Sequence, residues 1–480
     1  MDLSLRPYPL KEGFDEYFTA CGNPVHPMAL EVLARANRKG ADWLAHQLSK
    51  AQQQLLRDGV DYRLHQPTPT HTDRFLPFDP LPRLIDRNTW DLLTRGVIQR
   101  CIALDALVSD LYGDQRIIRD GCLSEEMVTS SPYWRPELLG SCGKVQRWCA
   151  VAAFDLICTG PGEWMVLEEN LRRGSGIGYA MAARESSCQY FSWLMEGLDI
   201  ETIDAAPTLL RETLVALAPW RLDPDLVVLT PGRETSAFYE HKRLAEAMGV
   251  PVHEANELWV EEGQLWRPTA AGAIAVDVIY RRNEDFYPAG TTNEESILGI
   301  PGLKQIWLQG KVAIANPPGT GLASDKLLYS WVPDVIRYYL GEEPIIAQVP
   351  TYRCVDPIER SYVQERLETL VVKQVGGAGG AGMLMGPEST HALRQHFSAL
   401  IEKRPRHFIA QPVQHLSELP CVLSGELRPC HVDLRLVVLY GKKTYLTQTA
   451  MTRVALSPGS RIVNFSQGGG IKDTWILGSF

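Results

Sequence analysis

The segment VVKQVGGAGGAG spans Val371 to Gly382 and joins Lys373 to a run made only of glycine and alanine. The β-branched residues before Lys373 predict a strand over 369–375. Glycine lets the backbone approach a ligand closely, and successive N–H groups can bind phosphate oxygens. The glycines placed for such contacts are Gly376, Gly377, Gly379 and Gly380. We therefore expect a loop that covers phosphates, with a flexible linker as the alternative.

The segment matches neither of two common phosphate-binding motifs. A P-loop has its lysine after the glycines, whereas Lys373 precedes them. A dinucleotide-binding fingerprint begins a helix within its glycines and needs a later acidic residue at a set distance, and this run has neither feature.

Upstream, the strand-like runs Val151–Cys158 and Trp164–Glu168 are joined by a Thr-Gly-Pro-Gly turn and predict a β-hairpin. Glu168 and Asn170 lie two residues apart, so they face the same side of a strand, and Asp155 can lie opposite them on the partner strand. Two carboxylates and an amide oxygen suit a Mg²⁺ ion that bridges nucleotide phosphates. The alternative is a solvated acidic face.

Arginines recur on strand-like segments near the end of the chain. Asp433 and Arg435 share one face of the predicted strand His431–Leu439, and Arg453 follows in the next segment. Guanidinium groups are rigid bidentate donors, which suits an oxyanion or a transferring phosphoryl group. The alternative is structural salt bridging, which is the role we expect for Asp433.

Helical periodicity over Ala29–Leu56 and Trp90–Leu111 predicts a mainly helical beginning of the chain. The Pro- and Thr-rich stretch 65–85 between these helices predicts an ordered surface loop. Its Arg74 and Arg83 are candidates for contacts with anions or with solvent.

Residues 206–320 predict an open α/β unit. Leu226–Leu229 has the pattern of a buried strand, Ser236–Met248 that of a helix and Val250–His253 that of the next strand, which begins a βαβ arrangement. Ala275–Tyr280 predicts a further strand. Polar residues of this unit are candidates for a pocket that holds a substrate, namely Arg233, Glu234, Tyr280, Arg281, Arg282 and Asp285.

Composition limits the class of protein. The chain has 480 residues, of which 45% are hydrophobic and 22% charged, as in globular proteins. The formal net charge is −9 and no dense basic run occurs, which argues against a nucleic-acid partner. No apolar stretch nears the roughly 20 residues of a membrane span and no secretory signal is visible, so we expect a cytoplasmic protein without a membrane partner. The 10 cysteines form no CxxC pair, which argues against a structural zinc site.

Taken in order, these segments resemble the circularly permuted ATP-grasp family (type 2), which is similar to the synthetase domain of glutathionylspermidine synthase. In ordinary ATP-grasp ligases a D…ExN metal hairpin follows the lysines, whereas here Asp155, Glu168 and Asn170 precede Lys326 and Lys373. The resemblance covers nearly the whole chain and includes PRLI at 82–85, LEENLR at 167–172, LTPG at 229–232, IYRR at 279–282, SDK at 324–326, HVDLR at 431–435 and SQGGG at 466–470.

The resemblance implies an α/β (α+β) fold, a circularly permuted ATP-grasp. The implied units are a mainly helical region at 1–140, a metal-binding hairpin segment at 141–205, an α/β substrate-side unit at 206–320 and an ATP-binding remainder at 321–480. It also implies individual roles: Lys326 and Lys373 hold the ATP phosphates; Asp155, Glu168 and Asn170 bind Mg²⁺; Arg435 and Arg453 stabilise the transferring phosphoryl group; Asn464 assists the metal or substrate; and Gln411, in a hinge at 408–412, contacts adenine.

The reaction implied is the ATP-dependent joining of a small-molecule carboxylate to an amine or peptide through an acyl phosphate, with release of ADP and phosphate. A phosphotransferase that uses the same site and a nucleotide-binding scaffold without turnover are the alternatives. A homo-oligomer is compatible with the ligase and with both alternatives. His431 and His241 are candidates for a base that activates the amine, although a lone histidine is more often a packed or surface residue.

Overall fold

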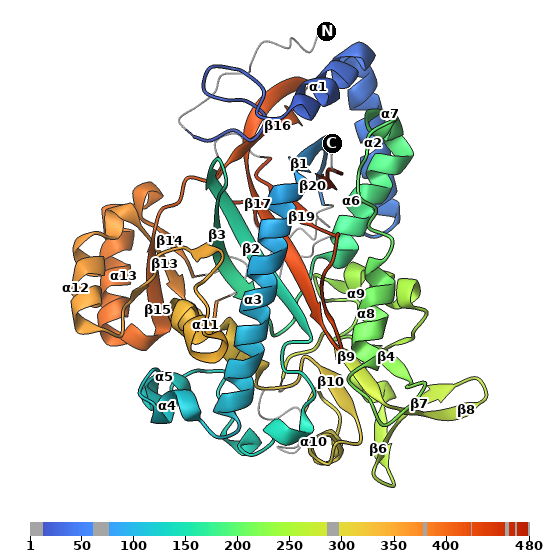
Figure 1. Ribbon diagram of the computed structural model, residues 1–480, viewed down its shortest axis with the longest axis vertical. Helices are drawn as coiled ribbons and strands as arrows, with labels where there is room; N and C mark the ends of the chain where they lie inside the picture. Colours follow the sequence, from blue (N-terminus) through green and yellow to red (C-terminus); the bar gives the residue numbers. More distant parts are fainter. Residues whose placement is uncertain are drawn as a thin grey trace.

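A nine-stranded sheet forms the centre of the protein, in the order β1-β20-β19-β17-β2-β3-β11 with β16 and β18 also paired to β17 (Figure 1). The computed structural model describes residues 13–60, 76–285, 297–377, 382–423, 425–456, 460–465 and 468–478. The strands are β1 (Phe78–Ile85), β2 (Val151–Gly160), β3 (Glu163–Asn170), β11 (Ala347–Gln348), β16 (Glu418–Leu423), β17 (Glu426–Tyr440), β18 (Thr444–Leu446), β19 (Met451–Val454) and β20 (Gly470–Ile476).

Strand alternation gives this sheet two different faces. On β2, Phe154 and Leu156 pack into the core that includes helix α3 (Arg87–Leu111). Ala153 faces the opposite side, in the core of helix α6 (Ile177–Tyr190). Asp155 follows the parity of Ala153, and therefore its carboxylate lies on the face opposite α3.

The predicted hairpin is confirmed. Strands β2 and β3 pair antiparallel, with Asp155 opposite Glu168 and Ala153 opposite Asn170. The ladder shifts between Asp155 and Leu156, which is an irregularity that re-aims side chains locally.

Within 206–320, the structure has a parallel sheet in the order β10-β9-β4-β5, while the bounds of this stretch as a separate unit stay a prediction. Its strands are β4 (Leu226–Leu229), β5 (Val252–His253), β9 (Val278–Arg281) and β10 (Ala313–Ala315), and its helices include α8 (Ala206–Val215), α9 (Phe238–Met248) and α10 (Leu303–Leu308). The predicted strand Ala275–Tyr280 was wrong in its extent: the residues divide between β9 and β8 (Gly272–Val276). Strand β8 pairs instead in a small antiparallel sheet with β7 (Gln264–Thr269), next to β6 (Trp259–Glu261).

A separate four-stranded sheet carries Lys373. Its order is β12-β15-β13-β14, with β12 (Tyr352–Arg353), β13 (Leu370–Gln374), β14 (Leu384–Met385) and β15 (Phe408–Pro412). Helices α12 (Pro357–Glu365) and α13 (His391–Lys403) accompany it at the left of Figure 1.

Near the beginning of the chain, the predicted helical character of Ala29–Leu56 is confirmed, whereas the expected surface loop is wrong at its end. The helical stretch Ala29–Leu56 is two helices, α1 (Pro27–Lys39) and α2 (Ala41–Arg57), because Gly40 between them has φ +81°. The end of the expected surface loop is β1, a strand at the edge of the main sheet, where prolines are tolerated because one side needs no N–H donors. Arg74 lies outside the described residues.

The remaining helices are α4 (Arg116–Arg119), α5 (Glu125–Thr129), α7 (Ser192–Met195) and α11 (Val332–Leu340). Across the described ranges, no helix combines the length and the apolar character that crossing a membrane requires.

A buried ion pair joins strands from the two ends of the chain. Lys472 of β20 contacts Asp79 of β1 and donates to the Pro420 carbonyl at 3.0 Å, while Asp79 accepts from the Val422 N–H at 2.7 Å. Both side chains are almost completely buried, so losing one partner leaves an uncompensated charge in the core.

We expect Asp79→Ala to lower the free energy of unfolding by about 3–5 kcal/mol, the usual cost of orphaning a buried ion. Urea denaturation followed by tryptophan fluorescence measures it. Glu343→Gln, which breaks an exposed pair with Arg337, serves as control and should change stability by less than about 1 kcal/mol. Equal effects of the two substitutions would contradict the structural role of Asp79.

Candidate functional site

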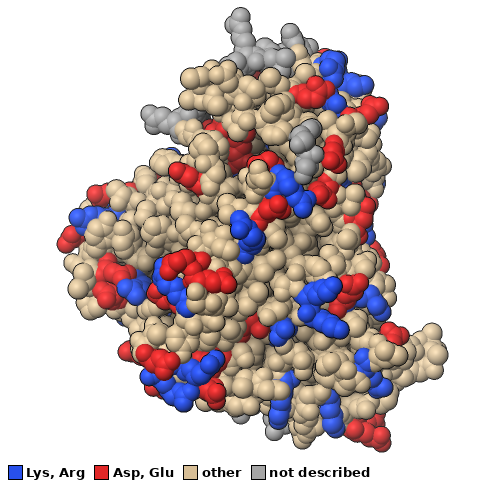
Figure 2. Space-filling view, viewed as in Figure 1, with Lys and Arg blue, Asp and Glu red and all other residues tan. Residues whose placement is uncertain are grey.

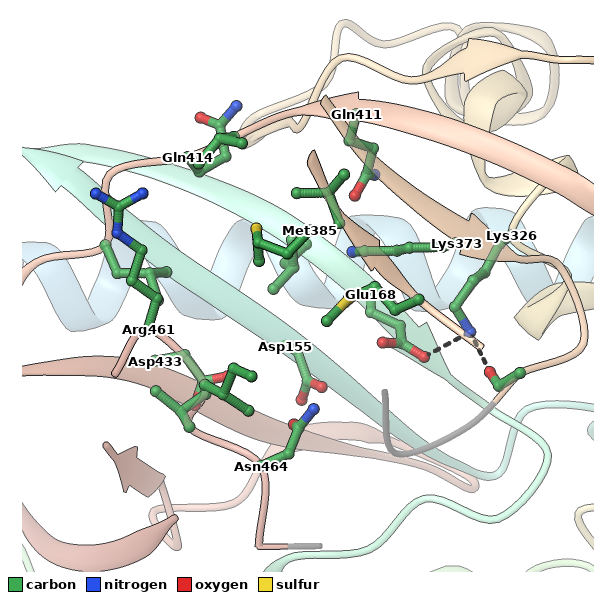
Figure 3. Close-up of a pocket in the computed structure, with 18 of the residues that line it drawn as sticks. Asp155, Glu168, Lys326, Lys373, Met385, Gln411, Gln414, Asp433, Arg461 and Asn464 are labelled. Carbon is green, nitrogen blue, oxygen red and sulfur yellow. Dashed lines mark hydrogen bonds and ion pairs between the residues drawn. The ribbon is translucent and has the colours of Figure 1, made fainter. Parts of the chain in front are cut away.

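A cavity lies between the nine-stranded sheet and the sheet that carries Lys373 (Figure 3). Strands β2 and β3 supply one wall, β13, β14 and β15 the other, and the segment 460–464 closes one side. The described residues that line it are Asp155, Leu167, Glu168, Lys326, Val371, Lys373, Gln374, Gly377, Met383, Met385, Gln411, Pro412, Val413, Gln414, Leu416, Asp433, Arg453, Arg461, Ile462, Val463 and Asn464.

The polar end of the cavity is built on a row of charges across three strands. Arg435 of β17 lies opposite Asp155 of β2, which lies opposite Glu168 of β3. The Arg435 guanidinium donates to both Asp155 oxygens, at 2.5 and 2.7 Å. Asn170 donates to Asp155 at 3.4 Å. The hairpin carboxylates and the amide therefore gather on one face, as the sequence predicts.

Asp155 is held in its ionised form by two arginines. Besides Arg435, Arg453 of β19 contacts it at 3.0 Å and also pairs with Asp433. Burial alone would raise the pKa of Asp155, but the two guanidinium groups lower it well below the usual carboxyl value. For Asp433, burial raises the pKa in spite of Arg453. The structural role expected for Asp433 agrees with this buried position.

Lys326 connects the hairpin to the glycine-rich segment. Its ammonium group contacts the Glu168 carboxylate at 3.0 Å and donates to the Gly377 carbonyl at 2.7 Å (Figure 3). Two neighbours fix the lysine in place. Ser324 Oγ accepts the backbone N–H groups of Leu171 and Arg172, and Asp325 pairs with Arg406 at 2.7 Å.

Lys373 enters the same space from the opposite sheet. It is partly buried, and desolvation lowers the pKa of its ammonium group to about 8, with Glu168 opposing this shift and Lys326 adding to it. Lys326 and Lys373, which come from different segments of the chain, therefore both lie near the Glu168 carboxylate.

The other end of the cavity is mostly apolar. Val371, Met383 and Met385 form one side, and Ile462 and Val463 come from the segment 460–464. Gln411 of β15 is buried and donates to Thr351 Oγ1 at 2.9 Å. The connecting residues 412–414 continue along this end, so backbone N–H and C=O groups border an apolar slot.

The structure brings together most of the predicted site residues. Asp155, Glu168, Lys326, Lys373, Gly377, Gln411, Arg453 and Asn464 line the cavity, and Asn170 and Arg435 contact Asp155 beside it. The Gly376 carbonyl accepts from the Tyr133 hydroxyl at 3.4 Å. Gly379 and Gly380 lie outside the described residues.

Sequence reasoning missed Arg461 and Gln414, which stand at the end of the cavity away from the lysines (Figure 3). Arg461 precedes the predicted Asn464 by three residues, with Ile462 and Val463 between them. The two polar residues on either side of two apolar ones were the sequence feature from which a contribution of Arg461 to the cavity could have been predicted.

Other predicted candidates have structural partners instead. Arg83 is a buried β1 residue that pairs with Glu16 and donates to the Asp433 carbonyl at 3.0 Å. Arg281 pairs with Asp285, and Arg282 with Glu240, and all four side chains are buried. The pairs of Arg83 with Glu16 and of Arg282 with Glu240 join distant segments, which local sequence does not reveal, whereas Arg281 and Asp285 lie four residues apart.

Neither candidate histidine is among the described residues that line the cavity. Burial, with Arg282 and Arg173 nearby, lowers the pKa of His241 to about 2. Its ring lies 2.9 Å from the Thr230 hydroxyl. His431 contacts the Leu416 carbonyl at 3.2 Å.

The family model described as circularly permuted ATP-grasp type 2 matches residues 82–455. This chain belongs to that family. The predicted fold class, an α/β circularly permuted ATP-grasp fold, is thereby confirmed, and the family as a whole is characterised by ATP binding. The division into four units and the roles of individual residues remain predictions.

Two relatives show the range of similarity. An uncharacterized protein of Synechocystis sp. is 40% identical over 478 residues, which cover 99% of each chain. A protein of Frankia alni with the provisional name glutamate–cysteine ligase 2-3 is 38% identical over 470 residues, which cover 97% of this chain and 54% of that protein.

A solved structure, a glutathione synthetase-like effector from Globodera pallida in its apo form, superposes with a TM-score of 0.54 at 11% identity. The match covers 90% of this ATP-grasp chain and 96% of that one. At this identity the likeness concerns the fold alone.

We expect Arg435→Met to destabilise the ATP-grasp core by about 3–5 kcal/mol at pH 7, because Asp155 loses one of its two buried guanidinium partners. The folded-state pKa of Asp155 is lowered, so its contribution is present above the unfolded pKa near 4 and is lost as the pH falls through the lowered folded-state value. Urea titrations at pH 7 and at acid pH should therefore show a difference between wild type and variant that shrinks on acidification. A difference independent of pH would contradict this reading.

Proposed function

We propose that this protein is an ATP-dependent ligase that joins a carboxylate to an amine through an acyl phosphate. The observation that carries the proposal is the convergence of Lys326, Lys373 and the hairpin carboxylates at the polar end of a cavity whose other end is apolar. A nucleotide matches these two ends, because its planar base suits the apolar end and its negatively charged phosphates suit the polar end. The name of the Frankia relative, a ligase, agrees with this assignment.

In this proposal the base of ATP occupies the slot between Met385 and Val463, bordered by the backbone of residues 412–414. The triphosphate extends toward Lys326 and Lys373, whose ammonium groups neutralise it. Arg453 at the cavity wall stabilises charge on the transferring phosphoryl group. Arg435 contacts Asp155 and so positions that carboxylate.

Asp155, Glu168 and Asn170 fit Mg²⁺ as a set of hard oxygen ligands. Within the described ranges, no three His, Cys, Asp or Glu side chains are grouped so that they could hold a metal on their own. The set therefore suits an ion that takes its other ligands from phosphates and water. When bound, Mg²⁺ supplies charge neutralisation and orientation of the phosphates.

The reaction needs no nucleophile from the protein. An oxygen of the substrate carboxylate attacks the γ-phosphorus, and the bond from that phosphorus to the bridging oxygen of ADP breaks. The nitrogen of the amine then attacks the acyl carbon, phosphate leaves with the bonding pair, and the nitrogen loses a proton. Positioning and electrostatic stabilisation account for the acceleration, and the Gly376–Gly377 segment at the cavity edge excludes water from the acyl phosphate.

The direct test incubates the pure protein with ATP, Mg²⁺ and pooled acids, amines and peptides, and detects condensation products by mass spectrometry. We expect ADP release that depends on both an acid and an amine. Release that needs the acid alone would indicate a phosphotransferase, and nucleotide binding without turnover would indicate a scaffold; either result overturns the ligase proposal. Lys373→Ala should abolish product, whereas the exposed control Lys442→Ala should retain it.

A second prediction concerns protons. Because the free-state pKa of Lys373 is about 8 and bound phosphates favour the ammonium form, nucleotide binding should raise that pKa. ADP binding near pH 8.5 should therefore take up protons, and affinity should weaken as the pH rises above about 8. Calorimetry in buffers of different ionisation enthalpy measures the uptake.

Lys373→Arg is the matched control, since arginine stays charged at these pH values. It should bind ADP without the uptake. An uptake that persists in the variant, or that is absent from the wild type, would contradict the role of Lys373.

A further inference from the structure

Two consecutive arginines follow the metal hairpin directly. Arg172 and Arg173 come after Asn170 and Leu171 at the end of β3. Their guanidinium groups converge on one carboxylate: Glu284 Oε2 lies 2.6 Å from Arg172 Nη1, and Glu284 Oε1 lies 2.6 Å from Arg173 Nη2. One carboxylate therefore bridges two arginines, with one oxygen on each.

The charges around this pair do not balance. Arg281 and Arg282 lie beside it, but they are matched by the buried carboxylates of Asp285 and Glu240. Among the residues that the structure describes, Arg172 and Arg173 share only Glu284. Counted over the described part of the chain, one positive charge is thus in excess in a half-buried place, which favours an additional or competing anion.

The pKa of Arg173 and the exposure of Glu284 are both consistent with an excess of positive charge at this pair. Burial lowers the pKa of Arg173 to about 10, with Glu284 opposing the shift and the neighbouring arginines adding to it. Glu284 is about half exposed, with 49% of its side-chain area accessible, so it can leave the pair without opening the core.

The pair lies next to the proposed phosphate end. The Arg172 N–H donates to Ser324 Oγ, two residues before Lys326. The Arg172 guanidinium stacks over the Tyr133 ring, 5.3 Å from its centroid, and the Tyr133 hydroxyl contacts the Gly376 carbonyl. One aromatic ring thus separates the pair from the start of the glycine-rich segment.

We propose that Arg172 and Arg173 form a carboxylate clamp that anchors the acid substrate, with Glu284 occupying the clamp until the substrate displaces it. The clamp does not line the cavity that holds the lysines, so the carboxylate that it binds is not the one that is phosphorylated. The acid substrate accordingly carries a second carboxylate, as a dicarboxylic acid, an acidic amino acid or a peptide does. This inference rests on the proposed ligase function for its choice of ligand.

The test titrates glutarate, a simple dicarboxylate, into the full chain with Mg²⁺ and ADP present, and follows binding by calorimetry. Glu284→Gln should bind glutarate about tenfold more tightly than the wild type, because the internal competitor loses its charge. Arg173→Gln should bind it at least about tenfold more weakly. The matched controls Glu343→Gln and Arg337→Gln, which break an exposed pair, should leave affinity unchanged.

Three results would overturn the clamp: no glutarate binding to any variant, equal affinities in wild type, Glu284→Gln and Arg173→Gln, or parallel changes in the controls. Repeating the titration with the diamine putrescine should show no tightening in Glu284→Gln. A clamp that instead held the γ-phosphate would be revealed if Arg173→Gln weakened a non-hydrolysable ATP analogue more than ADP. These titrations measure binding and not turnover. The ligase proposal can therefore fail while the clamp is supported, and the clamp can fail while the ligase proposal is supported.

Discussion

The contact between Lys326 and Glu168 is the constraint on which the site depends. Without a nucleotide, the two lysines stand in one partly dehydrated cavity, where burial lowers the pKa of Lys373 and the charge of Lys326 adds to that shift. The Glu168 carboxylate compensates charge through its contact with Lys326, and the Gly377 carbonyl accepts a hydrogen bond from the same ammonium group. A polyanion would satisfy both ammonium groups at once. The polar end therefore suits a polyanion, such as the phosphate chain of the proposed nucleotide.

Strand alternation separates the site from the core. Glu168 points into the cavity, whereas its neighbour Glu169 lies on the opposite face and pairs with the buried Arg100 of α3 at 2.6 Å. The same parity places Arg435 with Asp155, while Leu434 and Leu436 pack toward α3. One sheet can therefore hold a charged row on one side and a hydrocarbon core on the other. On the visible outer surface, basic and acidic residues lie in small groups separated by uncharged areas (Figure 2).

Much of this arrangement could be predicted from sequence, where the signal is local. The two-residue spacing of Glu168 and Asn170 fixes their common face, and the turn fixes the position of Asp155 opposite them. The lysine before a glycine run could be recognised for the same reason. Contacts between distant segments could not: Ser324 holding the end of the hairpin, Glu16 pairing with Arg83, and the strand β1 formed by a proline-rich stretch all depend on partners far away in sequence.

In the proposed complex, segments far apart in the chain surround one triphosphate. A crystal structure with Mg²⁺ and a non-hydrolysable ATP analogue tests it most directly. We expect the γ-phosphate between Lys326 and Lys373 and beside Glu168, with the base between Met385 and Val463. A nucleotide bound elsewhere, such as at the carboxyl ends of β4 and β9, would contradict it.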